Sequence, residues 1–173
     1  MTQLHDPLHP HSHDPNPAPP SENADFLLSL PDGTVQTITP DNLRGRPQTT
    51  LRDCFIVSTG HGTSGPFAFT GVTLADLVGD YWAAAWEEAE VISADGFGTR
   101  LSAAEVDAVT SRPILLACAV AGQPLSRAAG LVRLIVPSET DDALKQVKWI
   151  GEVRILNAET QRLAEPTPPS AGP

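Results

Sequence analysis

The sequence predicts an α+β protein in which a mixed sheet, or a partial β-barrel, carries short helices. Short runs of β-branched and aromatic residues recur along the chain, turn residues separate them, and helical spacing of apolar residues appears in only a few places. Such a mixture of strands and short helices is typical of α+β folds. With 173 residues, of which 40% are hydrophobic, the chain can build the core of one globular domain.

The composition divides the chain into three parts. Residues 1–24 hold six of the seventeen prolines and four of the five histidines, so we expect a disordered tail there. Residues 157–173 have a similar composition, and we expect them to be flexible. The folded domain is therefore predicted to span 25–156. An alternative for the first tail is metal handling, because histidines on a flexible chain converge easily on one ion.

The first half of the domain is predicted to hold a hairpin, a helical turn and two strands. The hairpin turns at Asp32, and Thr39 caps a helical turn with Pro40 at its first position. The run 49–59 is rich in β-branched and aromatic residues, which favours a strand. A further strand is predicted at 67–71, so the glycine-rich stretch between the two strands is interpreted as a loop.

The second half is predicted to add two helices and four strands. Thr73 precedes an amphipathic helix whose apolar residues are spaced three and four apart. A strand and a turn at Asp95 follow, and Ser102 and Glu105 have the spacing of a capping box that begins another helix. Three more strand candidates are the segments "RPILLACAV", "GLVRLIVP" and "VKWIGEVRIL".

Charge and hydropathy exclude several classes of partner. A net charge of −10 repels nucleic acid and anionic membranes, and no apolar run is long enough to span a membrane. The chain also lacks the features of a secretory signal, so we expect a cytoplasmic protein.

Cys54 and Cys118 lie in separate apolar runs and are interpreted as reduced core thiols. Five of the eleven basic residues fall between Arg127 and Arg154, where they would face an anionic ligand.

Four segments resemble, in this order, the oxidoreductase molybdopterin-binding domain of the sulfite-oxidase type. They are "FTGVTLADLV", "VISADGFGTRLSAAEV", "ILLACAVAGQPLSRAAGLVRLIVP" and "LKQVKWIGEVRI", and the similarity covers nearly all of 25–156. The resemblance implies a mixed α/β fold that binds molybdenum through the dithiolene of a pterin phosphate. It also implies a protein cysteine thiolate as a further metal ligand, and chemistry that transfers an oxygen atom or reduces an oxide.

The resemblance places the metal site near the start of the glycine-rich loop. The family's ligand cysteine corresponds to Ser58 or Thr59, and neither is cysteine. Cys54 is the candidate metal ligand if a longer loop brings it into place; the alternative is a buried structural thiol. Ser58, Thr59 and His61 are candidate cofactor-binding residues, because polar groups among glycines allow close approach of a ligand. Alternatively, they make only local hydrogen bonds, as turn residues commonly do.

Basic residues near the end of the domain complete the expected site. Arg133 matches a family arginine directed at the cofactor and substrate, and an arginine in an apolar strand needs an anionic partner. We therefore expect it to bind the cofactor and to act in catalysis. Lys145 and Lys148 match the basic residues that lie against the pterin phosphate; the alternative is a solvated strand edge. Ala129 and Val132 depart from the polar residue and the proline that are usual in the family.

The resemblance thus implies a minimal molybdopterin-dependent oxidoreductase of the oxygen-atom-transfer type. Its pocket would be formed by 58–71, Arg133 and 138–149, and its substrate would be a small oxyanion-like molecule or an oxide. Electrons would come from an external electron-transfer partner, because the chain has no haem or flavin motif. The alternative is a binding module that keeps the fold but has lost the metal-ligating cysteine.

Overall fold

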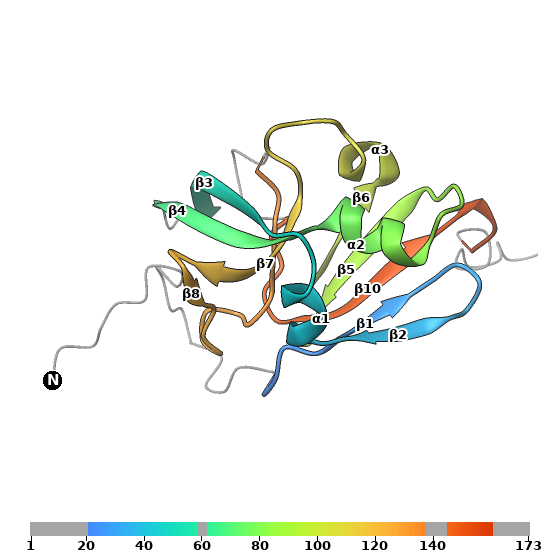
Figure 1. The fold of residues 1–173 in the computed structure, drawn as a ribbon, viewed down its shortest axis with the longest axis horizontal. Coiled ribbons are helices and arrows are strands. Elements are labelled where there is room, and N and C mark those ends of the chain that lie inside the picture. The colour runs from blue at the N-terminus through green and yellow to red at the C-terminus, as the bar shows by residue number, and fades with distance from the viewer. Residues whose placement is uncertain (1–20, 59–61, 138–144, 161–173) are drawn as a thin grey trace, which may run out of the picture.

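Residues 21–58, 62–137 and 145–160 are described by the computed structural model, and their strands form two five-stranded sheets (Figure 1). In spatial order, sheet A consists of β2 (Val35–Ile38), β1 (Phe26–Ser29), β10 (Ile150–Leu156), β5 (Glu88–Ser93) and β6 (Gly98–Ser102). β1 and β10 run parallel, whereas the other neighbours are antiparallel. The predicted mixed sheet is therefore confirmed.

Sheet B is antiparallel throughout. Its strands are β3 (Thr49–Ser58), β4 (Gly62–Thr73), β7 (Leu115–Val120), β8 (Gln123–Pro124) and β9 (Arg133–Ile135), in the order β3-β4-β7-β8 with β9 paired to β7. The described strands do not close into a barrel. The fold is thus α+β with two open sheets, and β6 and the two-residue strand β8 are the two strands that the sequence pattern did not predict.

Three short helices begin where the sequence predicts caps. They are α1 (Pro40–Arg44), α2 (Leu74–Tyr81) and α3 (Ala103–Val106). The hydroxyl groups of Thr39, Thr73 and Ser102 each accept a hydrogen bond from a backbone N–H of the first helical turn, as N-cap residues do. None of the described helices is long and apolar enough to cross a membrane.

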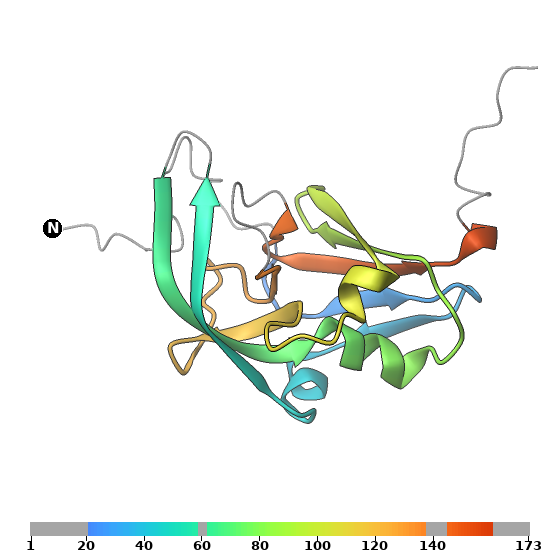
Figure 2. The same cartoon turned by 90° about the horizontal axis from the view of Figure 1, so that it is seen from above.

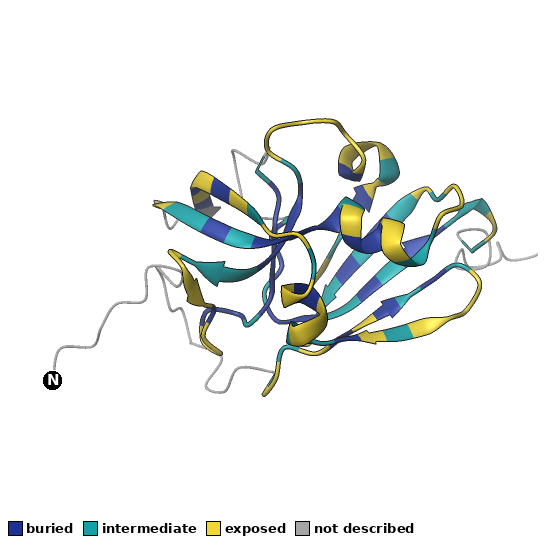
Figure 3. Cartoon of the chain, in the orientation of Figure 1, coloured by how far each residue is buried: buried dark blue, intermediate teal, exposed yellow. Residues whose placement is uncertain are grey.

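The apolar side chains form two clusters that meet at β7 and β9 (Figure 3). The larger cluster lies between one face of sheet A and α2. The smaller cluster lies on sheet B and includes Leu51, Cys54 and Phe69. Leu116 and Leu134 point into the larger cluster, whereas their neighbours along the same strands point into the smaller one. Both faces of β7 and β9 are therefore buried, which explains their almost uninterrupted apolar sequences.

The predicted loop between the strands at 49–59 and 67–71 is strand from Gly62 onward, which corrects the sequence interpretation. β4 begins at Gly62 and pairs with β3 almost to the tip of a long hairpin, which projects from the rest of the domain (Figure 2). Two irregularities in the pairing lie on either side of Cys54, and the adjacent Asp53 has a positive φ of 53°. Cross-strand hydrogen bonds outweigh the weak strand propensity of glycine and proline here.

Candidate cofactor site

A buried cation marks the centre of the predicted site. Arg133 is only 3% exposed, and its Nη1 donates a hydrogen bond to the carbonyl of Ala129 at 3.2 Å. Arg133 on β9 pairs with Ala117 on β7 and lies two residues before Ile135. Residues two apart in a strand point to the same face, so Arg133 shares a sheet face with the smaller apolar cluster, which contains both Ala117 and Ile135. A guanidinium held in this way offers charge-assisted donors to an anion.

Gly130 brings a second cation next to Arg133. A Cβ atom at Gly130 would lie 3.0 Å from Cβ of Lys148 and 3.2 Å from Cγ of Arg133. Only a residue without a side chain allows these two stems to approach so closely. The Nζ atom of Lys148 lies 4.5 Å from the ring centre of Trp149, which is a cation–π distance. The stems of the Arg133 and Lys148 side chains therefore both lie against Gly130, and the two residues are called the cationic pair below.

Unusual backbone conformations accompany this pair. Gly130, Leu131 and Trp149 have positive φ angles of 110°, 57° and 48°. The Trp149 N–H donates to the carbonyl of Gly130 at 2.9 Å, and its indole Nε1 donates to the carbonyl of Arg127 at 2.6 Å. Non-glycine residues at positive φ cost free energy and persist where the surroundings require them, and such sites are often functional. Here the two hydrogen bonds of Trp149 hold two separate segments of chain against each other and maintain the strained backbone.

Lys145 is held by an acidic partner. Its Nζ atom lies 2.5 Å from Oε1 of Glu105, the residue that also closes the capping box of α3. Hydrogen bonds from Lys145 and from Ser102 lower the pKa of Glu105 from 4.5 to about 2. The ion pair connects α3 to the segment before β10, so Lys145 is positioned by a residue 40 positions away in the sequence.

Cys54 lies buried beside a guanidinium. Its Sγ atom is within 3.6 Å of the Leu51 carbonyl and of Nη2 of Arg112, and Arg112 also donates to the carbonyls of Arg52 and Asp53. Burial raises the pKa of the Cys54 thiol, while the nearby Arg112 opposes that rise. Burial likewise raises the pKa of the other thiol, Cys118.

Sheet B places Cys54 and Arg133 on the same face but at different positions along the strands. Arg133 lies in a row of paired residues with Ala117, Gly71 and Thr49, and Cys54 is five residues further along β3. No hydrogen bond or ion pair joins the two residues in the part of the chain that the structure describes.

Of the predicted site residues not yet discussed, the structure describes only Ser58. Ser58 is the last residue of β3 and pairs with Gly62. Thr59 and His61 lie outside the described residues, as does most of the predicted pocket segment 138–149. The histidine-rich tail over residues 1–20 lies outside them too.

The comparison with protein families identifies the domain. The sequence profile described as "Oxidoreductase molybdopterin binding domain" matches residues 29–164, which is most of the chain. The chain belongs to this family. The resemblance found in the sequence is therefore confirmed, and the family implies a molybdopterin cofactor.

Solved structures support the fold of this molybdopterin-binding domain. The chain matches the sulfane dehydrogenase SoxCD from Paracoccus pantotrophus with a TM-score of 0.63 and 19% sequence identity. The match covers 77% of this chain and 38% of the SoxCD chain. At this identity the likeness extends to the fold alone. No curated protein matches the sequence.

The residues of the domain fit the anionic part of a pterin phosphate cofactor. The cationic pair supplies hydrogen-bond donors for a phosphate. Gly130, which has no side chain, allows the stems of both cationic residues to lie close to the backbone at that position. The described residues hold no group of three or more His, Cys, Asp or Glu side chains suited to a metal ion. Such a group is not needed for a metal that arrives with its own sulfur ligands.

Sequence reasoning missed four residues at this site. Gly130 and Trp149 fall within the quoted family segments, and the glycine three residues before Arg133 was a usable signal. Arg112 gave no signal as a partner of Cys54, because their contact joins segments far apart in the chain. Glu105 was recognised only as a cap, although it also pairs with Lys145.

Proposed function

We propose that the domain binds a molybdenum-containing molybdopterin and catalyses oxygen-atom transfer. The observation that carries this proposal is the cationic pair of Arg133 and Lys148 around Gly130, in a chain that belongs to the molybdopterin-binding family. A buried arginine is expensive to desolvate, so a protein that keeps one in an apolar strand gains most when an anion binds there.

The cationic side chains would hold the pterin phosphate and the substrate. Lys148, fixed against Trp149, is assigned to the phosphate, together with Lys145. Because Lys145 already pairs with Glu105, it must share its charge between that carboxylate and the phosphate. Arg133 is assigned to an oxygen atom of a small oxyanion-like or oxide substrate, for which its planar donor group is suited.

The hairpin would supply the metal side of the site. Cys54 is assigned as the thiolate ligand, with the Arg112 guanidinium stabilising negative charge on the sulfur. Binding a metal releases the thiol proton, which offsets the effect of burial. Ser58, Thr59 and His61 are assigned to the rim of the pocket, as the resemblance to the family suggests.

When bound, molybdenum would supply two-electron redox chemistry coupled to the movement of an oxygen atom. The protein contributes position and charge: Arg133 orients the substrate oxygen, and the apolar cluster beside Cys54 excludes water from the sulfur. An external electron-transfer partner completes the proposed cycle, and the cytoplasm is the proposed location.

Elemental analysis and pterin release test the proposal. The untagged protein, produced in a host that makes the cofactor, is expected to contain near-stoichiometric molybdenum and to release a fluorescent oxidised pterin. Cys54→Ser is expected to lose the metal, whereas the matched control Cys118→Ser keeps it. Absence of both metal and pterin from the wild-type protein would refute the proposal and favour a cofactor-free binding module.

Arginine variants test the role assigned to Arg133. Arg133→Gln removes the charge but keeps hydrogen-bonding capacity and much of the side-chain volume. Loaded protein carrying this change is expected to reduce an oxide substrate at least about tenfold more slowly, because a charge-assisted hydrogen bond contributes roughly 1.5–3 kcal/mol. A variant that keeps full activity would remove Arg133 from the catalytic site.

A further inference from the structure

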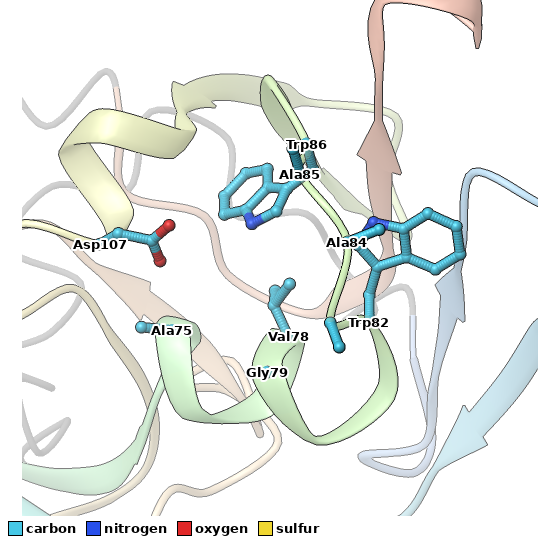
Figure 4. A pocket seen from close by; sticks show the side chains of 9 residues that line it. Ala75, Val78, Gly79, Trp82, Ala84, Ala85, Trp86 and Asp107 are labelled. Carbon is cyan, nitrogen blue, oxygen red and sulfur yellow. The ribbon is translucent and has the colours of Figure 1, made fainter.

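A second candidate site lies beside α2 and is built from none of the residues assigned to molybdopterin. A pocket of about 450 Å³ opens between α2, the loop from α2 to β5, and the end of α3. Ala75, Val78 and Gly79 line it from α2, Trp86 from the loop, and Asp107 from the end of α3 (Figure 4). A concave space lined by apolar residues together with one charged side chain is a common form of ligand site.

The charges around this pocket are negative. Trp82, the C-cap of α2, and Asp107, the C-cap of α3, are both lining residues, so the C-terminal ends of two helices border the pocket. Neither helix has a basic residue in its last turn to compensate for its terminal carbonyl groups. No Lys, Arg or His is among the residues that line the pocket, whereas the exposed Asp107 adds a full negative charge.

A tryptophan indole and a carboxylate border the same space in this pocket. Figure 4 shows the Trp86 indole, the Val78 side chain and the Asp107 carboxylate directed toward the same space, while the Trp82 indole lies on the other side of the loop. The Trp86 side chain is half-buried and packs against the larger apolar cluster, and the residues between the two tryptophans are Ala83, Ala84 and Ala85, whose small side chains also line the pocket. A tryptophan ring face attracts cations more strongly than any other side-chain ring.

We propose that this pocket binds a small organic cation, namely a substituted ammonium group with apolar substituents. The ammonium group lies between the Asp107 carboxylate and the Trp86 ring, and the apolar substituents contact Val78 and Ala75. The same charges disfavour anions, so this ligand differs in class from the anionic ligands of the molybdopterin site. The net charge of −10 increases the local concentration of cations around the whole protein.

Choline and its uncharged isostere 3,3-dimethylbutan-1-ol test the proposal, because the two have nearly the same shape. Binding to the full chain is followed by calorimetry and by chemical-shift changes of the indole N–H groups. Choline is expected to bind at least about fivefold more tightly than the alcohol, given the strength of cation–π and ion-pair contacts at exposed sites. Raising the salt concentration is expected to weaken choline binding but not alcohol binding.

Three variants locate the site. Asp107→Asn and Trp86→Leu are each expected to weaken choline binding by about threefold or more. Gly79→Leu adds a side chain at a position where a Cβ atom meets nothing within 4 Å, so it blocks the pocket without disturbing the core. The control Asp95→Asn removes one charge at the β5–β6 turn but keeps an acceptor for the Phe97 N–H, so the turn is preserved. Asp95 does not line the pocket, and this variant is expected to leave choline binding unchanged.

The outcomes separate clearly. Preference for choline that is lost in Asp107→Asn and in Gly79→Leu supports the proposal. Equal binding of choline and the alcohol, an unaffected Asp107→Asn variant, or no choline binding at millimolar concentration would overturn it. None of these results depends on molybdenum, so failure here leaves the function proposed for the molybdopterin site untouched.

Discussion

Replacing Gly130 with alanine tests the geometry of the cationic pair directly. At a φ of +110°, an L-residue is strained by roughly 1–3 kcal/mol. The new Cβ atom also meets Cβ of Lys148 at 3.0 Å and Cγ of Arg133 at 3.2 Å. These atoms lie close to the backbone, so moving them adds an overpacking cost of about 1 kcal/mol or more. The expected loss in the free energy of unfolding is about 2–4 kcal/mol.

Urea denaturation at 25 °C, followed by tryptophan fluorescence, measures this loss. The thermal midpoint is expected to fall by about 4–16 °C, since 1 kcal/mol corresponds to roughly 2–4 °C for a domain of this size. Gly79→Ala is the matched control, because its Cβ atom meets open space on a helix. It is expected to stabilise the protein by about 0.5–1 kcal/mol. A Gly130→Ala variant as stable as the wild type would refute the reasoning.

Three further predictions follow from other contacts. The pKa of Glu105 is lowered from 4.5 to about 2, chiefly by Lys145, so its contribution is present above pH 4.5 and is lost as the pH falls toward 2. Because the pair is partly exposed, we expect it to contribute only about 1 kcal/mol to the free energy of unfolding. Urea titrations at several pH values should show that Glu105→Gln removes this pH-dependent contribution. Gly71→Ala would place a Cβ atom 2.0 Å from the Leu116 carbonyl oxygen, and is expected to cost more than about 4 kcal/mol or to yield insoluble protein. Burial raises the pKa of Cys54, so in cofactor-free protein we expect iodoacetamide to modify this thiol at least about tenfold more slowly than in urea, as measured by mass spectrometry.

Local signals in the sequence were sufficient for most of the secondary structure. The caps at Thr39, Thr73 and Ser102 depend on contacts within four residues, so the pattern of side chains determines them. The turn at Asp32 is equally local, because its carboxylate accepts the N–H of Thr34 at 2.8 Å. The family was also recognisable, because four short segments occur in the right order.

Features that depend on distant contacts were not predictable. The stretch after Gly62 looks like a loop by composition, yet pairing with β3 makes it a strand. The ion pair between Lys145 and Glu105 requires knowledge of which segments meet. The pocket at Trp86 likewise depends on Asp107 arriving from another helix. The sequence therefore predicted which basic residues belong to the site, but not how they are positioned relative to one another and to their partners.

The place of β10 in sheet A has a consequence for synthesis on the ribosome. β10 separates β1 from β5, and its parallel pairing with β1 joins residues more than a hundred positions apart. The hairpin of β1 and β2 emerges early but has no partner until β10 has left the exit tunnel. The larger apolar cluster therefore stays incomplete until β10 has emerged, and we expect nascent chains to need protection from aggregation up to that point.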